Sequence, residues 1–517
     1  MKKKRIVSTL LALLLFAGLP VSALADTWDI SKGDIAVNAG SGGQTVTQGG
    51  GAAVEDSAPV ITGSSTENTL TINAEKDQTA NVTLSGVNID VRDKGKAAVS
   101  TTGEGNVSIE LNGDNTLKSG KGHAGLEKKN GGKLTIADED KNGKLTAEGG
   151  KYGAGIGGGD QGAGSGITIT GGEIKATGGQ YGAGIGGGKG DGSDITISGG
   201  EVNATGGTSG AGIGGGYNGN GSDITITDGE VNATGGKYGA GIGGGEYGIG
   251  KDIIITGGEV NATGGRFSAG IGGGSRGTGS DITISGGEVN ASGGVNGAGI
   301  GGGLRSKGKD ITVSGDTKLK VQGGDEDHYD GAGAGIGDGG SRPKGSTGGS
   351  PIPGAEVEPD TSGLTTNGSI EYYAPGADME KDKPTSTTTG KPTEPGKPTE
   401  PTEPTEPIEP AVPEQPEAER GMDAPLYFIT DRDGRAVRCR AERKGGVLTV
   451  TVDEDFAVLT SSLSGMTALR AQGIEKIIFV TNGAKTAVKL STIISKLTAN
   501  GVFRLTHDGK AVTFTLG

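Results

Sequence analysis

Polar side chains of one type return at a fixed interval through the middle of this 517-residue sequence, and these columns could bind a ligand. Glutamate, asparagine and aspartate each recur every 29 residues. Carboxylate and amide oxygens in such columns suit Ca²⁺, and they also suit sugar hydroxyls. The alternative is a solvated face that keeps the repeats soluble. The columns are Glu201, Glu230, Glu259 and Glu288; Asn203, Asn232, Asn261 and Asn290; and Asp194, Asp223, Asp252, Asp281 and Asp310.

A second candidate is a position that is mostly aromatic and precedes a glycine-rich phrase in each repeat. Rings in a column along one face would suit sugars, whose C–H groups contact a π surface. Alternatively, the side chains point inward and plug a corner of the fold. The position is held by Tyr152, Tyr181, Ser209, Tyr238, Phe267 and Asn296, so the candidate ligand-binding rings are Tyr152, Tyr181, Tyr238 and Phe267.

Four carboxylates stand within six residues in the segment 325–330, Asp-Glu-Asp-His-Tyr-Asp. Oxygen ligands at this density suit calcium, and we take Asp325, Asp327 and Asp330 as the candidate metal ligands. A charged surface loop is the alternative. Calcium is the only cofactor that the sequence suggests.

Residues for catalysis are not apparent. The three histidines, His123, His328 and His507, are far apart in sequence, and Cys439 is the only cysteine, so neither a zinc cluster nor a histidine-based triad is indicated. A catalytic site needs one singular constellation, whereas these repeats present the same groups many times. We therefore expect a protein that is not an enzyme, with a polysaccharide lyase as a distant alternative.

The element that must position these columns is a repeat built around the phrase Gly-Ala-Gly-Ile-Gly-Gly-Gly, first seen at 153–159. Intervals of 29, 28, 29, 29, 29 and 36 residues separate its isoleucines, which indicates a stacked repeat architecture. Two further phrases, Asp-Ile-Thr-Ile and Glu-Val-Asn-Ala, complete each unit. The anchor isoleucines are Ile156, Ile185, Ile213, Ile242, Ile271, Ile300 and Ile336.

Each phrase is short and alternates between apolar and polar residues, so it predicts a brief strand with its apolar residues facing inward. Three strands joined by glycine corners describe one coil of a right-handed parallel β-helix, with successive coils about 4.8 Å apart. A helical solenoid lacks the required 3.6-residue periodicity here, and a propeller blade needs more than 29 residues. The glycines of the third phrase would then form a flat outer face that either meets a ligand or packs in a turn.

The segment of residues 26–147 shows the same alternation of apolar and polar residues in a less regular form, with strands expected at 34–37, 69–72, 82–84, 87–91 and 107–111. Its residues 106–117, Asn-Val-Ser-Ile-Glu-Leu-Asn-Gly-Asp-Asn-Thr-Leu, together with His123-Ala-Gly-Leu126, Gly132-Lys-Leu-Thr-Ile136 and the glycine-rich units, resemble secreted bacterial carbohydrate-binding domain proteins of the β-helix type. The likeness covers about residues 27–340. It implies the fold and a carbohydrate ligand, and it transfers no binding residue.

The ends of the chain differ from its middle. Residues 1–25 combine Lys2–Arg5, an apolar run and Ala23-Leu-Ala25, as in a cleaved secretory signal; a retained membrane anchor is the alternative. No later segment is apolar enough to span a membrane. We predict irregular β-helix coils at 26–147, regular coils at 148–340, a Pro/Thr/Glu-rich acidic linker at 341–423 and a small α+β domain at 424–517.

The predicted linker contains proline at every third residue from 392 onward, which favours an extended polyproline II spacer. The C-terminal domain is predicted to have the order β-β-β-α-β-α-β-β, with a first hairpin turning at Asp433–Gly434, helices at 456–471 and from Leu490 to Leu497, and a closing hairpin at 503–516. Its cluster of arginines between 432 and 443 suggests attachment to an anionic cell-wall polymer, or a charged guard on a strand edge.

Net charge is −14, and the repeats carry no basic stripe interleaved with aromatics, so nucleic acid is not an expected partner. The sequence therefore predicts a secreted protein, held at the cell surface without a covalent anchor, that presents a β-helix on a stalk and binds a polysaccharide or cell-wall glycan. A structural or protein-binding spacer is the alternative.

Overall fold

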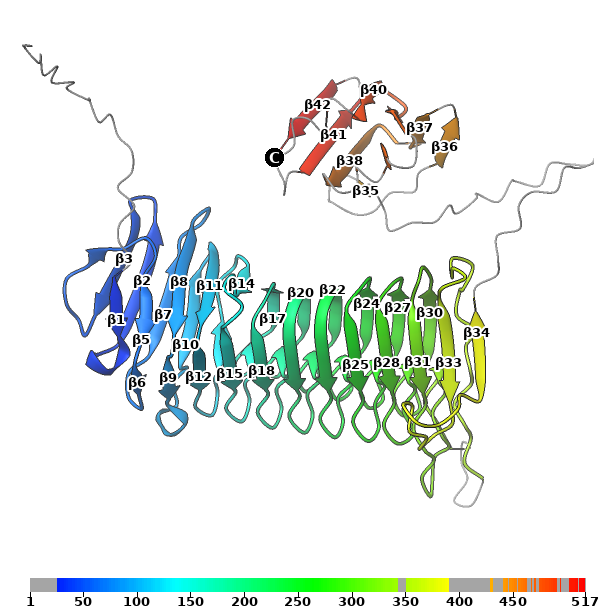
Figure 1. The fold of residues 1–517 in the computed structure, drawn as a ribbon, viewed down its shortest axis with the longest axis horizontal. Coiled ribbons are helices and arrows are strands. Elements are labelled where there is room, and N and C mark those ends of the chain that lie inside the picture. The colour runs from blue at the N-terminus through cyan, green and yellow to red at the C-terminus, as the bar shows by residue number, and fades with distance from the viewer. Residues whose placement is uncertain are drawn as a thin grey trace, which may run out of the picture. The chain divides into compact units, whose positions relative to one another are not determined.

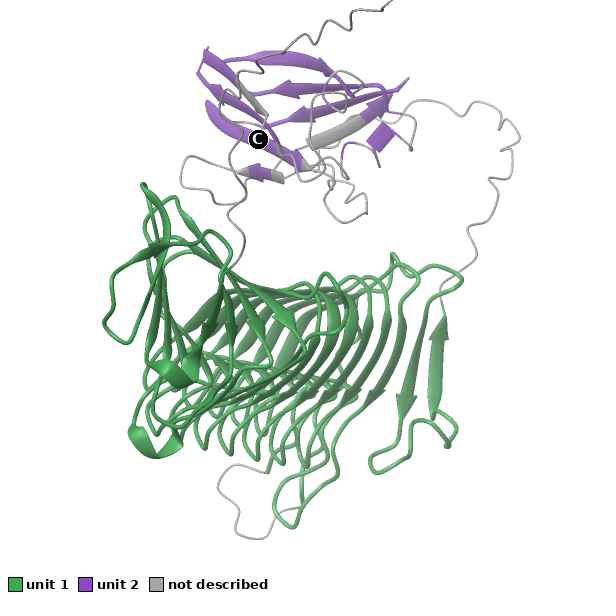
Figure 2. Cartoon of the chain, turned by 60° about the vertical axis from the view of Figure 1, so that its left-hand side comes forward, with its two compact units in different colours: residues 1–395 green, residues 396–517 purple. Residues whose placement is uncertain are grey.

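The structure is a computed structural model in which the chain divides into two compact units, residues 1–395 and 396–517, drawn in green and purple in Figure 2. The described residues are 26–342, 350–389, 428–430, 440–444, 446–452, 454–462, 466, 469–470, 474–490, 493, 502–509 and 511–516. The predicted signal peptide at 1–25 and the proline-rich part of the predicted linker lie outside them.

The first unit is a right-handed parallel β-helix, as the repeat period predicts (Figure 1). Its larger sheet has 21 strands and follows two faces of the coil. These strands are β1 (Thr27–Asp29), β5 (Val60–Thr62), β6 (Ser64–Ser65), β8 (Thr79–Ser85), β9 (Asn88–Asp90), β11 (Asn106–Asn112), β12 (Asp114–Lys118), β14 (Leu134–Ala137), β15 (Lys144–Glu148), β17 (Gly164–Ile169), β18 (Glu173–Thr177), β20 (Gly192–Thr205), β22 (Gly221–Thr234), β24 (Gly250–Ile255), β25 (Glu259–Thr263), β27 (Gly279–Ile284), β28 (Glu288–Ser292), β30 (Gly308–Val313), β31 (Lys318–Gln322), β33 (Ser369–Tyr373) and β34 (Ser386–Thr389).

The smaller sheet has 13 strands and forms the third face. Its strands are β2 (Ile35–Gly40), β3 (Gly43–Gln48), β4 (Val54–Glu55), β7 (Leu70–Ala74), β10 (Val99–Gly103), β13 (Leu126–Lys128), β16 (Ile156–Gly157), β19 (Ile185–Gly186), β21 (Ile213–Gly214), β23 (Ile242–Gly243), β26 (Ile271–Gly272), β29 (Ile300–Gly301) and β32 (Ile336–Gly337). Two 3₁₀ turns, η1 (Ile30–Lys32) and η2 (Arg92–Lys94), interrupt the early coils.

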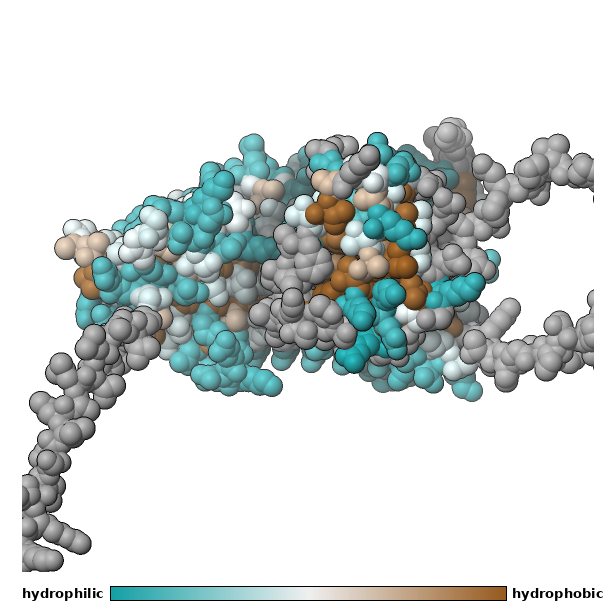
Figure 3. Space-filling model, turned by 90° about the horizontal axis from the view of Figure 1, so that it is seen from above, coloured by the Kyte–Doolittle hydropathy of each residue, from teal (hydrophilic) through white to brown (hydrophobic). Residues whose placement is uncertain are grey.

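Register between coils follows the sequence period residue by residue. Ile195 of β20 pairs with Ile224 of β22, and Glu201 pairs with Glu230. Six apolar residues per coil face inward as predicted, and in the coil of Ile213 all six are almost completely buried. These six are Ile195, Ile197, Val202, Ala204, Ala211 and Ile213. The core is therefore a narrow column of small and branched side chains. The surface of the N-terminal coils, at the left of Figure 3, is mostly hydrophilic on the face shown.

Both ends of the β-helix depart from the repeat. At the N-terminal end, β2 pairs with β3 and β3 pairs with β4, both antiparallel, so a folded-back ribbon extends the small sheet where no earlier coil exists. At the C-terminal end, β33 pairs in parallel with β31, and β34 pairs antiparallel with β33. The predicted boundary at residue 340 is therefore too early, because residues 350–389 add a last coil and a closing strand to the stack.

The second unit contains two four-stranded sheets. One is ordered β35-β38-β41-β42 and the other β36-β37-β39-β40. Their bounds are β35 (Phe428–Thr430), β36 (Arg440–Lys444), β37 (Val447–Thr451), β38 (Phe456–Ser462), β39 (Lys476–Val480), β40 (Lys485–Lys489), β41 (Val502–Asp508) and β42 (Ala511–Leu516). The predicted closing hairpin corresponds to β41 and β42.

One prediction for this unit is wrong at its start. The helix expected from Phe456 begins instead as strand β38, in which Ala457, Leu459 and Ser461 are buried in alternation. This two-residue period is what a strand requires, and the β-branched Val458 and Thr460 between them favour it. The expected first hairpin turns at Asp433–Gly434, which lies outside the described residues; in the described part β35 pairs with β38 and β36 pairs with β37.

Candidate functional site

One corner of the β-helix gathers aromatic rings from successive coils. The rings come from the predicted aromatic position before the third phrase and from two positions after it. The position before the phrase meets a position after the phrase of the next coil, since the backbone N–H of Tyr217 donates to the carbonyl of Tyr181 at 2.8 Å. We call this surface the aromatic ridge; it consists of Tyr152, Tyr181, Tyr217, Tyr238, Tyr247 and Phe267.

Four rings of the ridge form a continuous run. The centroids of Tyr152 and Tyr181 are 5.4 Å apart with planes 19° from parallel. Tyr217 follows Tyr181 at 5.6 Å, and Tyr247 follows Tyr217 at 6.3 Å, both edge to face. Rings in contact approach to about 3.5–4 Å, so centroids 5.4 Å apart mean that the stacked pair is slipped sideways. Part of each ring face therefore stays uncovered.

A second ring pair extends the ridge on neighbouring coils. Tyr238 and Phe267 stack with centroids 5.9 Å apart and planes 8° from parallel. Tyr247 is 46% exposed, and the other five rings are partly buried. The predicted rings thus lie together in two pairs at the surface, and they do not plug the core.

Cations accompany the rings along the ridge. Lys189 Nζ is 4.8 Å from the ring centroid of Tyr152, and Lys151 Nζ is 5.3 Å from the same centroid. A charge within about 6 Å of an aromatic face is attracted by the ring quadrupole. The remaining contacts are Lys121 with Tyr152 at 5.7 Å, Lys151 with Tyr181 at 5.8 Å, Lys237 with Tyr238 at 4.8 Å, Arg266 with Phe267 at 5.0 Å and Arg276 with Tyr247 at 5.8 Å.

The predicted asparagine column is a ladder of side-chain amides. Each amide nitrogen donates to the side-chain oxygen of the preceding coil, at 3.1 Å from Asn232 to Asn203, 2.9 Å from Asn261 to Asn232 and 2.7 Å from Asn290 to Asn261. Each of these bonds joins neighbouring coils, and Asn290 Oδ1, at the end of the ladder, is buried without a partner. The ladder therefore stabilises the stack.

The predicted glutamate column lies beside that ladder on the same face. Glu201, Glu230, Glu259 and Glu288 are in register and all exposed. Glu201 accepts a hydrogen bond from Asn203 at 3.0 Å. The face is thus acidic and solvated, and it contains none of the ridge residues.

The aspartate column marks a corner where the backbone is left-handed. The five aspartates have φ from 49° to 55°. Gly166 holds the same place in an earlier coil, with φ 67°. Asp tolerates this conformation better than most side chains. A backbone requirement therefore accounts for the residue type at Asp194, Asp223, Asp252, Asp281 and Asp310 without a ligand.

The glycines of the third phrase do not form an exposed face. Gly153–Gly159 are buried, and so are their counterparts in the next coils. A Cβ on Gly241 would lie 2.6 Å from the carbonyl oxygen of Gly270 and 2.7 Å from the backbone nitrogen of Thr263. Of the two interpretations of these glycines, close packing is the one that the structure supports.

The three carboxylates predicted to bind calcium are not brought together. Asp330 is buried and paired with Arg305 through two bonds of 2.7 and 2.6 Å. Asp327 accepts the backbone N–H groups of Tyr329 and Asp330, whereas Asp325 is exposed. Within the described residues no group of three or more His, Cys, Asp or Glu is arranged to hold a metal ion.

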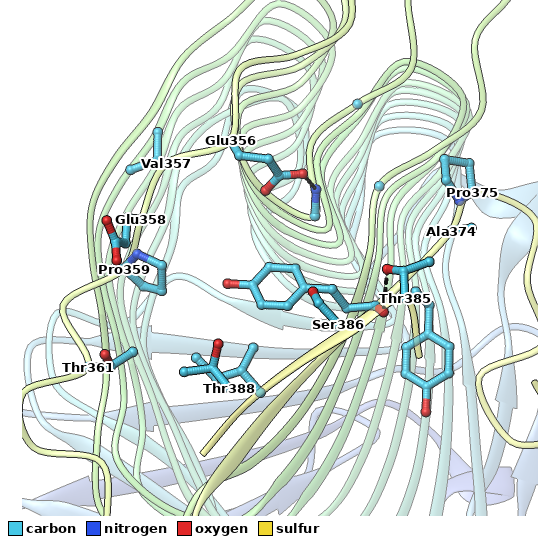
Figure 4. Close-up of a pocket in the computed structure, with 16 residues that line it drawn as sticks. Glu356, Val357, Glu358, Pro359, Thr361, Ala374, Pro375, Thr385, Ser386 and Thr388 are labelled. Carbon is cyan, nitrogen blue, oxygen red and sulfur yellow. Dashed lines mark hydrogen bonds between the residues drawn. The ribbon is translucent and has the colours of Figure 1, made fainter. Parts of the chain in front are cut away.

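A pocket of about 650 Å³ opens at the C-terminal end of the stack, between the last full coil and strand β34 (Figure 4). Glu356 and Glu358 enter it from the last coil, opposite Thr385 and Ser386. Burial and the two nearby carboxylates raise the pKa of Tyr372 in its wall to about 12. The pocket is distant in sequence from the ridge coils and shares no residue with them.

Sequence reasoning missed Tyr217, Tyr247 and all six cations of the ridge. Some of these residues follow the anchor isoleucine by four or five positions, and the others directly precede the aromatic position. At each of these positions the residue type varies from coil to coil. Only the adjacency of the two corner positions in space would have revealed them. The predicted arginine cluster lies mostly outside the described residues; of its members Arg443 and Lys444 are exposed on β36.

Comparison with known families agrees with the fold. The beta helix repeat model matches residues 141–160, 167–189, 195–217, 224–246, 253–275 and 282–304. These matches lie in the regular coils of the first unit and agree with its parallel β-helix fold. Neither the curated proteins nor the solved structures include one that matches this chain significantly. In the part of the chain that the structure describes, no helix has the length and apolar character needed to cross a membrane.

Proposed function

We propose that this β-helix repeat protein binds an extended polysaccharide along the aromatic ridge and does not transform it. The observation that carries the proposal is the continuous run of Tyr152, Tyr181, Tyr217 and Tyr247, whose neighbouring ring centroids are 5.4, 5.6 and 6.3 Å apart. Sugar rings present C–H groups to such a surface. A chain laid along the axis would meet one coil after another.

Rigidity supports this assignment. Each ring belongs to a corner whose backbone is hydrogen-bonded to the coils on either side, as the bond from Tyr217 to Tyr181 illustrates. A preformed surface loses little conformational entropy when a ligand binds. The neighbouring columns contribute other things: the asparagines stabilise the stack, and the acidic faces keep it soluble.

The proposal includes export. Lys2–Arg5, the apolar run after them and Ala23-Leu-Ala25 support a secretory signal, and the sequence resemblance to secreted carbohydrate-binding proteins supports a role outside the cell. In this setting the Pro-Thr-Glu segment would separate the β-helix from the second unit. The second unit would then hold the protein at the cell surface.

The test is binding of the full chain to a polysaccharide panel, measured by affinity electrophoresis and calorimetry. The variant Tyr181→Ala/Tyr217→Ala removes the middle of the run and is expected to weaken binding about tenfold or more. Tyr329→Ala is the matched control, because Tyr329 is 63% exposed and lies outside the ridge. Equal binding by both variants, or no binding by the parent chain to any polysaccharide, would favour the alternative of a surface spacer.

A further inference from the structure

The charges on the aromatic ridge define the class of polysaccharide. We infer that the ligand is an acidic polysaccharide with carboxylates repeated along its chain, an inference that rests on the proposed function. Six cations lie 4.8 to 5.8 Å from the ring centroids, spread over the same coils as the rings. A neutral glycan would need the rings but not this row of charges.

Most of these cations have no acidic partner. Lys189 lies 3.2 Å from Asp160, and within the described residues it is the only ridge cation in an ion pair. All but Lys189 are exposed, namely Lys121, Lys151, Lys237, Arg266 and Arg276. Cation–π contact leaves the N–H donors on the far side of each charge available. A carboxylate can accept them in a charge-assisted hydrogen bond.

The rest of the β-helix is not basic, which makes the row specific to the ridge. The net charge is −14, and the exposed glutamate and aspartate columns occupy other faces of the same coils. A polyanion is repelled from those columns and attracted to the ridge. The charge distribution therefore both selects an acidic chain and aligns it with the ridge.

Spacing supports repeated contacts. Equivalent residues of successive coils are about 4.8 Å apart, similar to the length of one sugar unit in an extended chain. Lys121 and Lys151 stand in one column on neighbouring coils, and Lys237 and Arg266 stand further along the same column on another two neighbouring coils. The two coils between these pairs carry Gln180 and Thr208 in that column. Carboxylated units of an extended chain can thus meet the two pairs of cations while their rings lie against the tyrosines.

A single-stranded nucleic acid is the other polyanion that aromatic residues and cations can bind. Base stacking needs free ring faces. On the ridge the faces are largely shared with other rings or with cations, as in the pairs Tyr152/Tyr181 and Tyr238/Phe267. The uncovered part of each face can meet a single C–H group of a sugar but not the whole face of a base, and the hydroxyls and N–H donors beside it suit carboxylates and sugar hydroxyls.

The experiment compares each acidic polysaccharide with its carboxyl-reduced form, in which a neutral hydroxymethyl group replaces each carboxylate. Polygalacturonate, alginate and hyaluronate are titrated into the full chain, with a single-stranded DNA oligonucleotide as a further probe. At least one acidic polymer is expected to bind about tenfold more tightly than its reduced form, with an affinity that falls as salt rises.

Two variants with the same change in net charge separate the ridge from general electrostatics. Lys151→Gln/Arg266→Gln/Arg276→Gln is expected to abolish the preference, whereas Lys76→Gln/Lys175→Gln/Lys318→Gln, at exposed lysines elsewhere, is expected to keep it. If reduced and acidic forms bind equally and Tyr181→Ala/Tyr217→Ala weakens both, the proposed function stands and this inference is wrong. If the DNA binds as tightly as the best acidic polymer, or if no polymer binds, the inference also falls.

Discussion

Single aromatic residues close the hydrophobic core at its two ends. Trp28 and Tyr372 are the partly buried aromatic side chains that pack against the core column. Trp28 donates its indole N–H to Asp56 at 2.8 Å. Tyr372 pairs in register with the buried Val321, so its ring continues the inward-facing column past the last full coil. An indole or phenol suits this place because one end is apolar and the other meets solvent.

The position of Tyr372 predicts how stability changes at alkaline pH. Burial and the carboxylates of Glu356 and Glu358 raise its pKa from the ordinary 10.0 to about 12. The folded state therefore favours the protonated phenol, so its contribution to the free energy of unfolding is full below pH 10 and is lost as the pH rises to about 12. Tyr372→Phe should make unfolding less sensitive to pH in this window.

Chemical denaturation at several pH values between 9 and 12 measures that effect. Tyr329→Phe is the control, because it removes a phenol that is 63% exposed and lies outside the core column. The pKa of Tyr373 is also raised to about 12, and its hydroxyl donates to Glu371 at 2.7 Å. Its contribution to the alkaline loss of stability is the same in both variants. An unchanged alkaline loss of stability in Tyr372→Phe would contradict the assignment.

Among the elements, the last strand of the small sheet meets a short antiparallel segment around Glu356, whose side chain also accepts hydrogen bonds from it. In each regular coil two backbone N–H groups of the third phrase donate to the next coil, as Gly299 does to Ala334 and Ile300 to Gly335, both at 2.9 Å. In β32 the donors Gly335 and Ile336 reach the two carboxylate oxygens of Glu356 at 2.7 and 3.1 Å. The carboxylate thus takes the place of the two carbonyls that a further coil would supply.

Removing this cap should loosen the end of the stack. Glu356→Ala leaves two backbone donors without their acceptors, which costs about 1–3 kcal/mol for each group that stays buried. Faster amide hydrogen exchange is expected at Gly335 and Ile336. Glu358→Ala is the control, because it removes a carboxylate from the same segment without touching the cap. Protection that is equal in the two variants would show that Glu356 does not cap the sheet.

The glycines of the third phrase are required by contacts between coils. A Cβ on Gly241 would meet backbone atoms at 2.6 and 2.7 Å, and neither neighbour can move without breaking the ladder. Gly241→Ala should therefore destabilise the β-helix by about 1–3 kcal/mol or more. Gly42→Ala, where a Cβ meets nothing within 4 Å, should be nearly neutral. Thermal unfolding of both variants by circular dichroism tests this, and a neutral Gly241→Ala would refute it.

At this scale the sequence allowed some features to be predicted and not others. The coil period and the inward residues, such as Ile195 and Val202, could be predicted because a ladder repeats them at a constant interval. The ridge could be predicted only in part, since Tyr217 and Tyr181 come from different corner positions that meet only across coils. The Glu356 cap occurs once, so no periodicity reveals it. Strand β38 shows that a short apolar segment can fit both the 3.6-residue period of a helix and the two-residue period of a strand.

For the whole first unit, the regular register means that each coil interacts almost entirely with its two neighbours. The free energy of unfolding of such a stack is approximately the sum of the intrinsic stability of each coil and the interaction energy between neighbouring coils. The equivalent residues Thr234 and Thr263 are partners in adjacent coils. Removing the 29 residues 235–263 therefore joins Thr234 to Gly264 in the same structural context that Thr263 has now.

This excision predicts a folded β-helix shortened by one coil, about 4.8 Å. Its far-ultraviolet circular dichroism should keep the β-sheet form, and unfolding should stay cooperative, with stability reduced by about one coil's share. Removing only residues 235–248 is the contrasting variant, because it deletes β23 and leaves a coil with two faces where its neighbours have three. The inward column would then be open to water on one side, so this shorter deletion should unfold at a lower temperature than the longer one. The reverse order of stability would mean that total length, and not the register of whole coils, holds the stack together.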